Sequence, residues 1–483
     1  MARSSRTTPA SPWRITAPLV VSSFAYATAQ NTIVPVIPQV QEATGSSASQ
    51  VAWMITGFFV SSAGLTVLTG RLGDLFGRKR VLCAILAIFG GGAAIAALGN
   101  SLAPIIAGRV VMGVGGGVFP LAYAILSAHL PRDRAAFGMG LISSMFGVGG
   151  ALGLPLGGLV AGHFGHKGLF WATAAVALLA LATVAGAIPS DRGERTGTVD
   201  WLGAILLTLA LGGPLTAVSR AEEWGWAAPW TLGLLALGAV ASAVFLVVER
   251  KVSHPLVDLD VMRRRNVWAA NLVTLLATTG HGVMFFLVPQ IVQLPKSSGV
   301  GLGVDVDHSG LFLLPGAVLL IFAGPLTGRL VARFGTRLPL ALGVALGCAG
   351  LVILAAGSSQ PVALLTGGAV LGLAGGVTYA TLPMLIADSV PLTDLGSANG
   401  VNTIVRHVSM AVSAQLAAAL VVSSIPASSP YPQWWAFTAN YGAAAVLAAL
   451  ALIPIGLLRP RQTAAPDPVG EHDAAAPTTP QIR

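Results

Sequence analysis

The sequence has little charge. Asp, Glu, Lys and Arg make up 9% of the 483 residues, whereas hydrophobic residues make up 54%. A soluble domain carries roughly a quarter charged residues, so most of this surface cannot face water. The alternating segments of about ten residues that a membrane β-barrel requires are also absent. Apolar runs of about 20 residues recur instead, which predicts an all-α polytopic membrane protein.

Several further absences exclude classes of function. The two cysteines, Cys83 and Cys348, lie in apolar runs without disulfide or metal-binding spacing. No phosphate-binding Gly-x-x-x-x-Gly-Lys-Ser/Thr motif occurs, which argues against an ATP-driven pump. No catalytic triad or metal cluster is present either. We therefore expect no enzyme activity, no metal and no cofactor.

The net charge of +9 could indicate a nucleic-acid partner. The basic residues, however, lie mostly in short loops on one side of the apolar runs, as the positive-inside rule requires. Lys167, Arg220 and Lys296 are the exceptions on the other side, and Arg109 and Arg406 fall within spans. We expect no nucleic-acid partner, and we expect both termini in the cytoplasm.

The apolar runs predict fourteen spans. They lie at about 16–39, 50–70, 81–99, 103–129, 137–162, 168–188, 201–219, 229–248, 267–293, 309–329, 338–357, 361–387, 397–424 and 435–458. The expected domains are an N-terminal tail (1–15), a six-helix half (16–188), a linker with two extra helices (189–266), a second six-helix half (267–458) and a disordered tail (459–483).

A repeat supports the two halves. The segment 70–80 (GRLGDLFGRKR) recurs with several substitutions at 328–337 (GRLVARFGTR). Pro131 and Gly140 recur in the same way as Pro391 and Gly400. Both repeats relate the first six spans to the last six, which is typical of transporters built from two related halves.

Residues 70–82 resemble the signature loop of the major facilitator superfamily, a pattern that Gly70, Leu72, Asp74, Gly77, Arg78, Lys79 and Leu82 fit. The fourteen-span layout resembles the drug:proton antiporter branch of that family. Residues 105–117 are similar to the branch's fourth-span motif, with Arg109 at the arginine position and Met112 where glutamine is usual. Residues 149–158 are similar to its fifth-span antiporter motif, although Leu154 replaces the usual proline.

The resemblance implies a major facilitator fold and export of small amphipathic or hydrophobic compounds, such as drugs and antibiotics. Transport would proceed by alternating access, and a proton gradient would supply the energy. We expect a bacterial plasma-membrane protein, working as a monomer in the lipid bilayer, with a small molecule and protons as its partners. Two alternatives remain: a proton-coupled symporter or facilitator for a metabolite, and a non-transporting membrane receptor or scaffold.

The expected gating residues lie in two motifs. In the first, Gly70 and Gly77 allow a tight connection, and Arg78 and Lys79 suit an anionic inner leaflet. Asp74 would cap a helix or pair with Arg78 to stabilise one conformer; a plain topogenic loop is the alternative. In the second motif, small residues permit close sliding of the fifth span or simple packing, and a proline should kink it: Gly153, Pro155, Gly157 and Gly158.

The proton path is less evident, because Gln30 stands where the branch commonly has an acidic residue and no Asp or Glu lies in the middle of a span. We expect Gln30 and Asn31 to line a cavity, or else to bond a neighbouring helix. We expect Arg109 to face the same cavity, with snorkelling to the membrane interface as the alternative. His281 could carry protons because histidine titrates near neutrality. Asp388 and Arg406, with His407, are further candidates.

Overall fold

The computed structural model describes residues 12–191, 193, 198–253 and 255–458, so the expected tail 459–483 lies outside the described residues. Within these ranges the regular structure consists of helices, without strands. The α-helices are α1 (Pro12–Asn31), α2 (Ile37–Thr44), α3 (Ala48–Val51), α4 (Trp53–Phe76), α5 (Arg78–Leu98), α6 (Leu102–Met112), α7 (Val118–His129), α8 (Arg132–Ala187), α9 (Trp201–Trp224), α10 (Pro229–Glu249), α11 (Leu259–Arg263), α12 (Arg265–Gln293), α13 (Val306–Ser309), α14 (Leu314–Phe334), α15 (Arg337–Ala356), α16 (Pro361–Ala387), α17 (Leu395–Ser423), α18 (Trp434–Leu450) and α19 (Leu452–Gly456).

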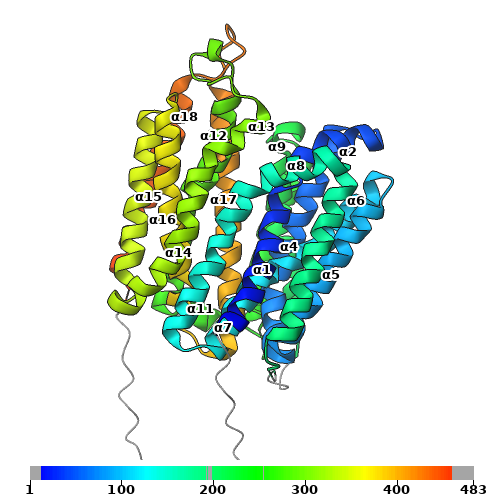
Figure 1. The fold of residues 1–483 in the computed structure, drawn as a ribbon, viewed down its shortest axis with the longest axis vertical. Coiled ribbons are helices and arrows are strands. Elements are labelled where there is room, and N and C mark those ends of the chain that lie inside the picture. The colour runs from blue at the N-terminus through cyan, green and yellow to red at the C-terminus, as the bar shows by residue number, and fades with distance from the viewer. Residues whose placement is uncertain (1–11, 192, 194–197, 254, 459–483) are drawn as a thin grey trace, which may run out of the picture.

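Two bundles of long helices lie side by side (Figure 1). The first contains α1 and α4 to α8, and the second contains α12 and α14 to α19; we call them the N half and the C half. The principal contacts between the halves join α8 to α14 and α4 to α17. The fold is therefore the predicted all-α architecture of two helical halves.

The number of candidate spans is smaller than the number that the sequence predicts. Among the described residues, twelve helices are long and apolar enough to cross a membrane. Helix α1 and the part of α8 before Leu156 fall outside these twelve, so the expected fourteen spans are not confirmed. Helix α8 consists of two helical segments that meet at a kink, where Gly165 leaves helical geometry with φ 67°.

The first predicted span is wrong in detail. We expected one run over 16–39, but α1 ends at Asn31 and a short 3₁₀ turn, Val34–Val36, separates it from α2. Pro35 and Pro38 explain the break, because each proline lacks the N–H that a continuing helix requires.

The signature segment is mostly helix rather than loop. Helix α4 continues through Phe76, Gly77 takes φ 96°, and Arg78 already begins α5. The second copy repeats this turn, since Gly335 takes φ 71° between α14 and α15. Only glycine adopts these positive φ values without strain, which explains why both copies keep it.

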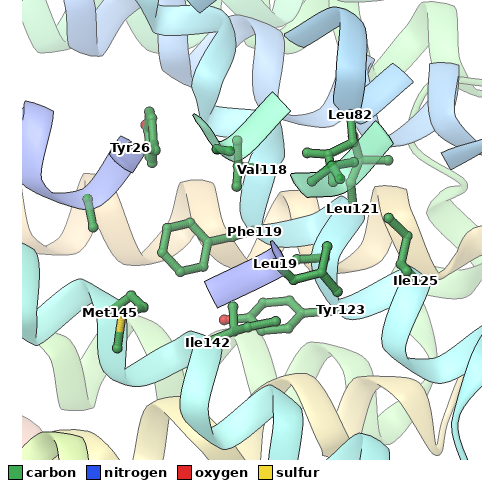
Figure 2. Packing of buried hydrophobic residues seen from close by; sticks show 14 of the residues in the cluster. Leu19, Tyr26, Leu82, Val118, Phe119, Leu121, Tyr123, Ile125, Ile142 and Met145 are labelled. Carbon is green, nitrogen blue, oxygen red and sulfur yellow. The ribbon is translucent and has the colours of Figure 1, made fainter. Parts of the chain in front are cut away.

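Each half has its own packed interior. In the N half, Leu19 of α1, Leu82 of α5, Phe119 of α7 and Ile142 of α8 meet (Figure 2). In the C half, residues of α12, α15, α16 and α18 form a second cluster, which includes Leu287, Leu351, Leu371 and Phe437. In a membrane such dispersion contacts, rather than the hydrophobic effect, hold helices together.

The inserted pair α9 and α10 packs against both halves. Helix α9 contacts α10, α4 and α17, so it covers one side of the junction between the halves. Gly64 of α4 allows this close approach, because a Cβ there would lie 2.1 Å from the Thr208 hydroxyl. The Arg220 guanidinium lies 4.9 Å from the Trp53 ring, which further fixes α9 to α4.

Candidate functional site

A cavity of about 350 Å³ lies between the halves. Its size is within the range of small-molecule sites. Helices α1, α4, α8, α9, α12, α14, α16 and α17 contribute side chains to its wall. The lining residues are mainly apolar or aromatic: Gln30, Asn31, Phe59, Ala63, Phe146, Gly147, Gly150, Leu215, Gly282, Phe285, Phe286, Leu313, Leu320, Tyr379, Arg406, His407, Val408, Met410, Ala411 and Ala414.

The halves close below this cavity, at the end of the bundle that carries the signature segment; we call this the loop end. Added Cβ atoms show how tight the closure is: one on Gly70 would lie 2.7 Å from the Gly396 carbonyl oxygen, and one on Gly140 would lie 2.1 Å from that of Gly324. The cavity residues of α4, α8, α14 and α17 all lie farther from the loop end than these glycines. The route from the cavity to the loop end is therefore shut in this conformer.

Asp74 and Arg78 strengthen the closure. The Arg78 guanidinium lies 3.2 Å from a carboxylate oxygen of Asp74, whose side chain is 4% exposed. The same guanidinium donates to the Leu392 carbonyl of the C half. Of the two expected arrangements for Asp74, the structure shows the pair with Arg78. The Lys79 ammonium group instead donates a hydrogen bond to the Ala185 carbonyl at 2.8 Å.

The helix cap comes from a residue that sequence reasoning missed. Asp191 accepts from the backbone N–H groups of Arg78 at 2.7 Å and Lys79 at 3.0 Å, and so caps α5. A carboxylate at a helix N-terminus satisfies free N–H groups and the helix dipole. The signal was available, because Asp191 is the first charged residue of the polar linker after the sixth span.

Asp388 lies at the loop end and not in the cavity. It forms an ion pair with Arg132, which joins the end of α16 to the start of α8. Nearby, Arg264 donates to the Ser389 carbonyl at 3.0 Å. The position favours a part in closure over the substrate or proton contact considered from the sequence.

Gln30 and Asn31 do line the cavity. Asn31 also donates to the Gly149 carbonyl at 3.4 Å, so both expectations for this amide hold. The Gln30 side chain lies near the Tyr26 hydroxyl, but its buried amide nitrogen forms no well-aligned hydrogen bond among the described residues. An amide in this state has a free donor to offer a ligand.

The fifth-span glycines pack α8 against α1. Cβ atoms on Gly149, Gly153 and Gly157 would lie 2.4, 2.7 and 2.5 Å from atoms of α1 and its extension. Gly158 is looser, with its nearest neighbour, Pro35, at 4.0 Å. The side chain of Pro155 lies outside the described residues. The close contact of α8 with α1 is clear, and its role in sliding stays a prediction.

Arg109 does not line the cavity, contrary to our expectation. It is 1% exposed and donates to the carbonyls of Ala29 at 3.0 Å and Met54 at 3.1 Å. Its guanidinium also lies 4.2 Å from the Phe58 ring. Since α1 ends at Asn31, the Ala29 carbonyl belongs to the last turn of that helix, where a cation is favourable. Arg109 therefore ties α1 to α4.

His281 lies beside the cavity rather than in its wall. It is 3% exposed, and its Nε2 lies 3.1 Å from the Leu371 carbonyl, to which it donates. Its ring centroid lies 5.0 Å from that of Tyr379, which does line the cavity. The role of His281 in proton transfer stays a prediction.

Arg406 is the charged residue that reaches the cavity. It is 2% exposed, and its guanidinium lies 4.1 Å from the Phe146 ring and 5.1 Å from the Tyr379 ring. His407 lies beside it, with a ring centroid 5.8 Å from that of Phe146. The sequence pointed to Arg406 but gave no sign of the two aromatic residues, which look ordinary within apolar runs.

The geometry defines a class. This is a multi-pass membrane protein with a ligand-sized cavity between two helical halves, and the halves close one end of the cavity. Such an architecture is typical of a transporter. The family model described as the Major Facilitator Superfamily matches residues 19–414 and 271–482 of this chain. The chain therefore belongs to the Major Facilitator Superfamily, whose fold is that of transporters.

Curated relatives include transporters for different compounds. A uridine/deoxyuridine transporter of Lactococcus lactis is 31% identical, over 71% of this chain and 72% of its own. The tetracenomycin C resistance and export protein of Streptomyces glaucescens is 30% identical, over 65% of this chain and 58% of its own. The lincomycin resistance protein of Streptomyces lincolnensis is 30% identical, over 64% and 63%. Such relatives are typical of the drug-efflux branch, although this chain spans less than two thirds of the two antibiotic resistance proteins.

Solved structures agree on the fold. The human organic anion transporter MFSD10 (TETRAN) superimposes with a TM-score of 0.65 at 16% identity, covering 92% of this chain and 99% of that one. The proton:xylose symporter XylE gives a TM-score of 0.61 at 15% identity, covering 91% and 94%. At this identity the likeness shows the fold alone.

Proposed function

We propose that this chain exports amphipathic or hydrophobic small molecules, antibiotics among them, by alternating access coupled to proton influx. The observation that carries the proposal is the cavity itself. It is lined mainly by apolar and aromatic side chains, and it lies between two halves whose contacts close one end. Rocking of the halves would close the other end and open this one.

The direction of transport rests on two supports. The fifth-span glycines Gly149, Gly153 and Gly157 fit the antiporter motif and pack against α1. The relatives include a tetracenomycin C export protein and a lincomycin resistance protein. Export also requires the loop end to face the cytoplasm, an orientation that the basic loops favour. We place the chain in the bacterial cytoplasmic membrane as a monomer.

Proton coupling needs a titratable group that meets the cavity. None of the described lining residues is Asp or Glu, and His407 is the lining residue of a type that ordinarily titrates near neutral pH. Its Nε2 is buried without a hydrogen-bond partner. We propose His407 as the first proton carrier to test, and His281 as the second because its ring lies against Tyr379. Because Arg406 opposes a second positive charge beside it, either histidine would take up a proton only when a bound anion or the movement of the halves offsets that charge.

Uptake of a nucleoside-like metabolite is the second candidate. It is favoured by the L. lactis relative, described as a uridine/deoxyuridine transporter, at 31% identity. Uridine is strongly polar, however, and few polar side chains line this cavity. A polar group of the ligand that is left unpaired on burial costs affinity, so a molecule with a mainly aromatic body suits this wall better than a nucleoside does.

Proteoliposomes with an imposed pH gradient test the proposal. We expect neutral antibiotics or other amphipathic compounds to move against their gradient while protons move down theirs. Uridine serves as the comparison substrate. Movement of uridine alone would favour the second candidate, and movement that ignores the pH gradient would contradict the antiport mechanism. His407→Gln and His281→Gln should be compared with the unaltered chain. The variant that lacks the proton carrier should transport at a rate that no longer depends on the pH gradient.

A further inference from the structure

Arg406 is buried in the cavity wall without a full set of partners. It is 2% exposed, and its Nε and one of its terminal nitrogens have no hydrogen-bond partner among the described residues. Its guanidinium lies between the Phe146 ring of the N half and the Tyr379 ring of the C half, at 4.1 and 5.1 Å. Aromatic faces attract a cation but accept no conventional hydrogen bond at the ring edge. The Tyr123 hydroxyl is the polar neighbour of the guanidinium, and it leaves those two nitrogens without a partner in the described part of the chain.

No carboxylate balances this charge in the part of the chain that the structure describes. The ion pairs found there join Arg78, Arg132, Arg220 and Arg263 to acids, and none involves Arg406. A charged side chain inside a membrane-spanning helix is costly unless it is paired, so an unbalanced one points to a function. The missing negative charge can come from a ligand in the cavity.

Neighbouring groups point to the same kind of ligand. The Gln30 amide nitrogen, the Tyr379 hydroxyl and His407 Nε2 are all buried without hydrogen-bond partners among the described residues, and all three residues line the cavity. Each of these atoms can donate a hydrogen bond. Donors gathered beside a guanidinium suit an oxygen-rich anionic group, which the planar guanidinium can bind in a bidentate manner.

The rest of the wall indicates the body of the ligand. Phe59, Phe285 and Phe286 line the cavity with Phe146 and Tyr379. Aromatic side chains stack favourably on planar rings. A lipophilic cation, in contrast, would bring a second positive charge against Arg406 in a low dielectric.

We propose that the cavity selects aromatic compounds that carry an acid group, with Arg406 as the residue that binds the anion. This inference rests on the transport function proposed above and names its substrate class. Phe146 and Tyr379 belong to different halves, so rocking of the halves would alter how Arg406 is held. Binding and release of the anion would thereby follow the conformational change.

Three matched probes test the selectivity: anthracene carboxylate, its amide and the corresponding aminomethyl compound. They share one aromatic body and differ in charge near neutral pH. Calorimetric titration of the full chain in lipid nanodiscs should show the carboxylate binding about 10- to 100-fold more tightly than the amide, as expected for a charged hydrogen-bonded pair. The amine should bind most weakly. Equal affinity for all three, or preference for the amine, would overturn the proposal.

Variants assign the selectivity to Arg406. Arg406→Gln should bring the affinity for the carboxylate down to that for the amide, whereas Arg406→Lys should keep part of the preference. Arg263→Gln is the matched control, because Arg263 is 68% exposed on α11. Unchanged carboxylate selectivity in Arg406→Gln would contradict the assignment.

Two measurements guard against misfolding and separate the two proposals. The unfolding temperature of ligand-free Arg406→Gln should equal or exceed that of the unaltered chain, because an unbalanced buried charge is removed; a lower value would mean that Arg406 has a structural role instead. In proteoliposomes, transport of the neutral amide without preference for the carboxylate would overturn only the substrate class. If no compound of any charge is transported, the function itself fails.

Discussion

A Cβ atom on Gly140 of α8 would lie 2.1 Å from the carbonyl oxygen of Gly324 on α14, and a Cβ on Gly324 would lie 2.2 Å from the carbonyl oxygen of Gly140. The two halves therefore touch backbone to backbone at this point. No side chain larger than hydrogen fits there without moving the helices apart. The closed loop end depends on this contact, because it lies between the cavity and the loop-end ion pairs.

The first prediction concerns this contact. Gly140→Val or Gly324→Val should prevent closure, so the population should shift to conformers in which α8 and α14 are apart at the loop end. Inverting a two-state population takes roughly 5 kcal/mol, which a clash with rigid backbone can supply. Transport should fall at least about tenfold, since closure is needed in every cycle.

Spin labels on exposed residues of the two halves measure the shift. Suitable positions are Arg134 on α8 and Arg333 on α14, in a background without Cys83 and Cys348. The distance between the labels should lengthen in Gly140→Val. Gly91→Val is the control, because a Cβ there meets nothing within 4 Å. The same distance distribution in Gly140→Val and the control would show that the contact does not govern closure.

A second prediction concerns Asp74. Asp74→Asn removes the carboxylate beside Arg78, whose guanidinium bridges to the Leu392 carbonyl of the C half. The pair lies within the N half, so only the hydrogen bond from Arg78 to Leu392 that it orients differs between the conformers. Weakening this bond by up to about 1.5 kcal/mol should make the closed conformer up to roughly tenfold less favoured. Transport in proteoliposomes should decrease accordingly.

Asp260→Asn supplies the comparison, because the Asp260 side chain is 91% exposed and pairs only loosely, at 3.6 Å. Wild-type transport by Asp74→Asn would mean that the pair is incidental. In the second copy, Ala332 stands at the matching position, so any latch of this kind is confined to the N half.

The third prediction separates the cap of α5 from this pair. Asp191→Ala removes the acceptor of the Arg78 and Lys79 N–H groups, at a cost of about 1–2 kcal/mol. Amide hydrogen exchange in the first turn of α5, residues 78–81, should accelerate about 5- to 30-fold, while exchange in the first turn of α12 should not. Equal protection of residues 78–81 before and after the change would refute the cap.

The sequence was a sound guide to the helices and a partial guide to the cavity. Apolar runs located the helices because length and hydrophobicity alone decide which segments fit a bilayer. They could not show that α4 runs through Phe76. The turn between α4 and α5 needs only one residue with positive φ, Gly77, so the charged residues around it can all be helical. They also hid the break after Asn31, although Pro35 and Pro38 were its signal.

The lining of the cavity was harder to predict, because it depends on how each helix is rotated about its axis. Gln30, Asn31 and Arg406 do face the cavity, whereas Arg109 and His281 bond to backbone carbonyls of neighbouring helices. All five are polar residues in apolar runs, and one sequence does not distinguish the two outcomes. Packing decides between them, and packing is a property of the whole fold.

The fourth prediction follows from this contrast between two buried arginines. Arg109 donates to Ala29 and Met54 and lies over Phe58, so its charge is held by groups within the N half. Arg109→Gln should lower the free energy of unfolding by about 2–4 kcal/mol, from two charged hydrogen bonds and a cation–π contact. Arg406→Gln should leave it unchanged or raise it.

Ligand binding should show the reverse pattern. Arg109 does not line the cavity, so Arg109→Gln should keep the carboxylate-over-amide selectivity of the unaltered chain, whereas Arg406→Gln should lose it. Thermal unfolding and calorimetric titration of both variants, made in parallel, measure the two effects. Loss of selectivity in Arg109→Gln at unchanged stability would place Arg109 in the binding machinery.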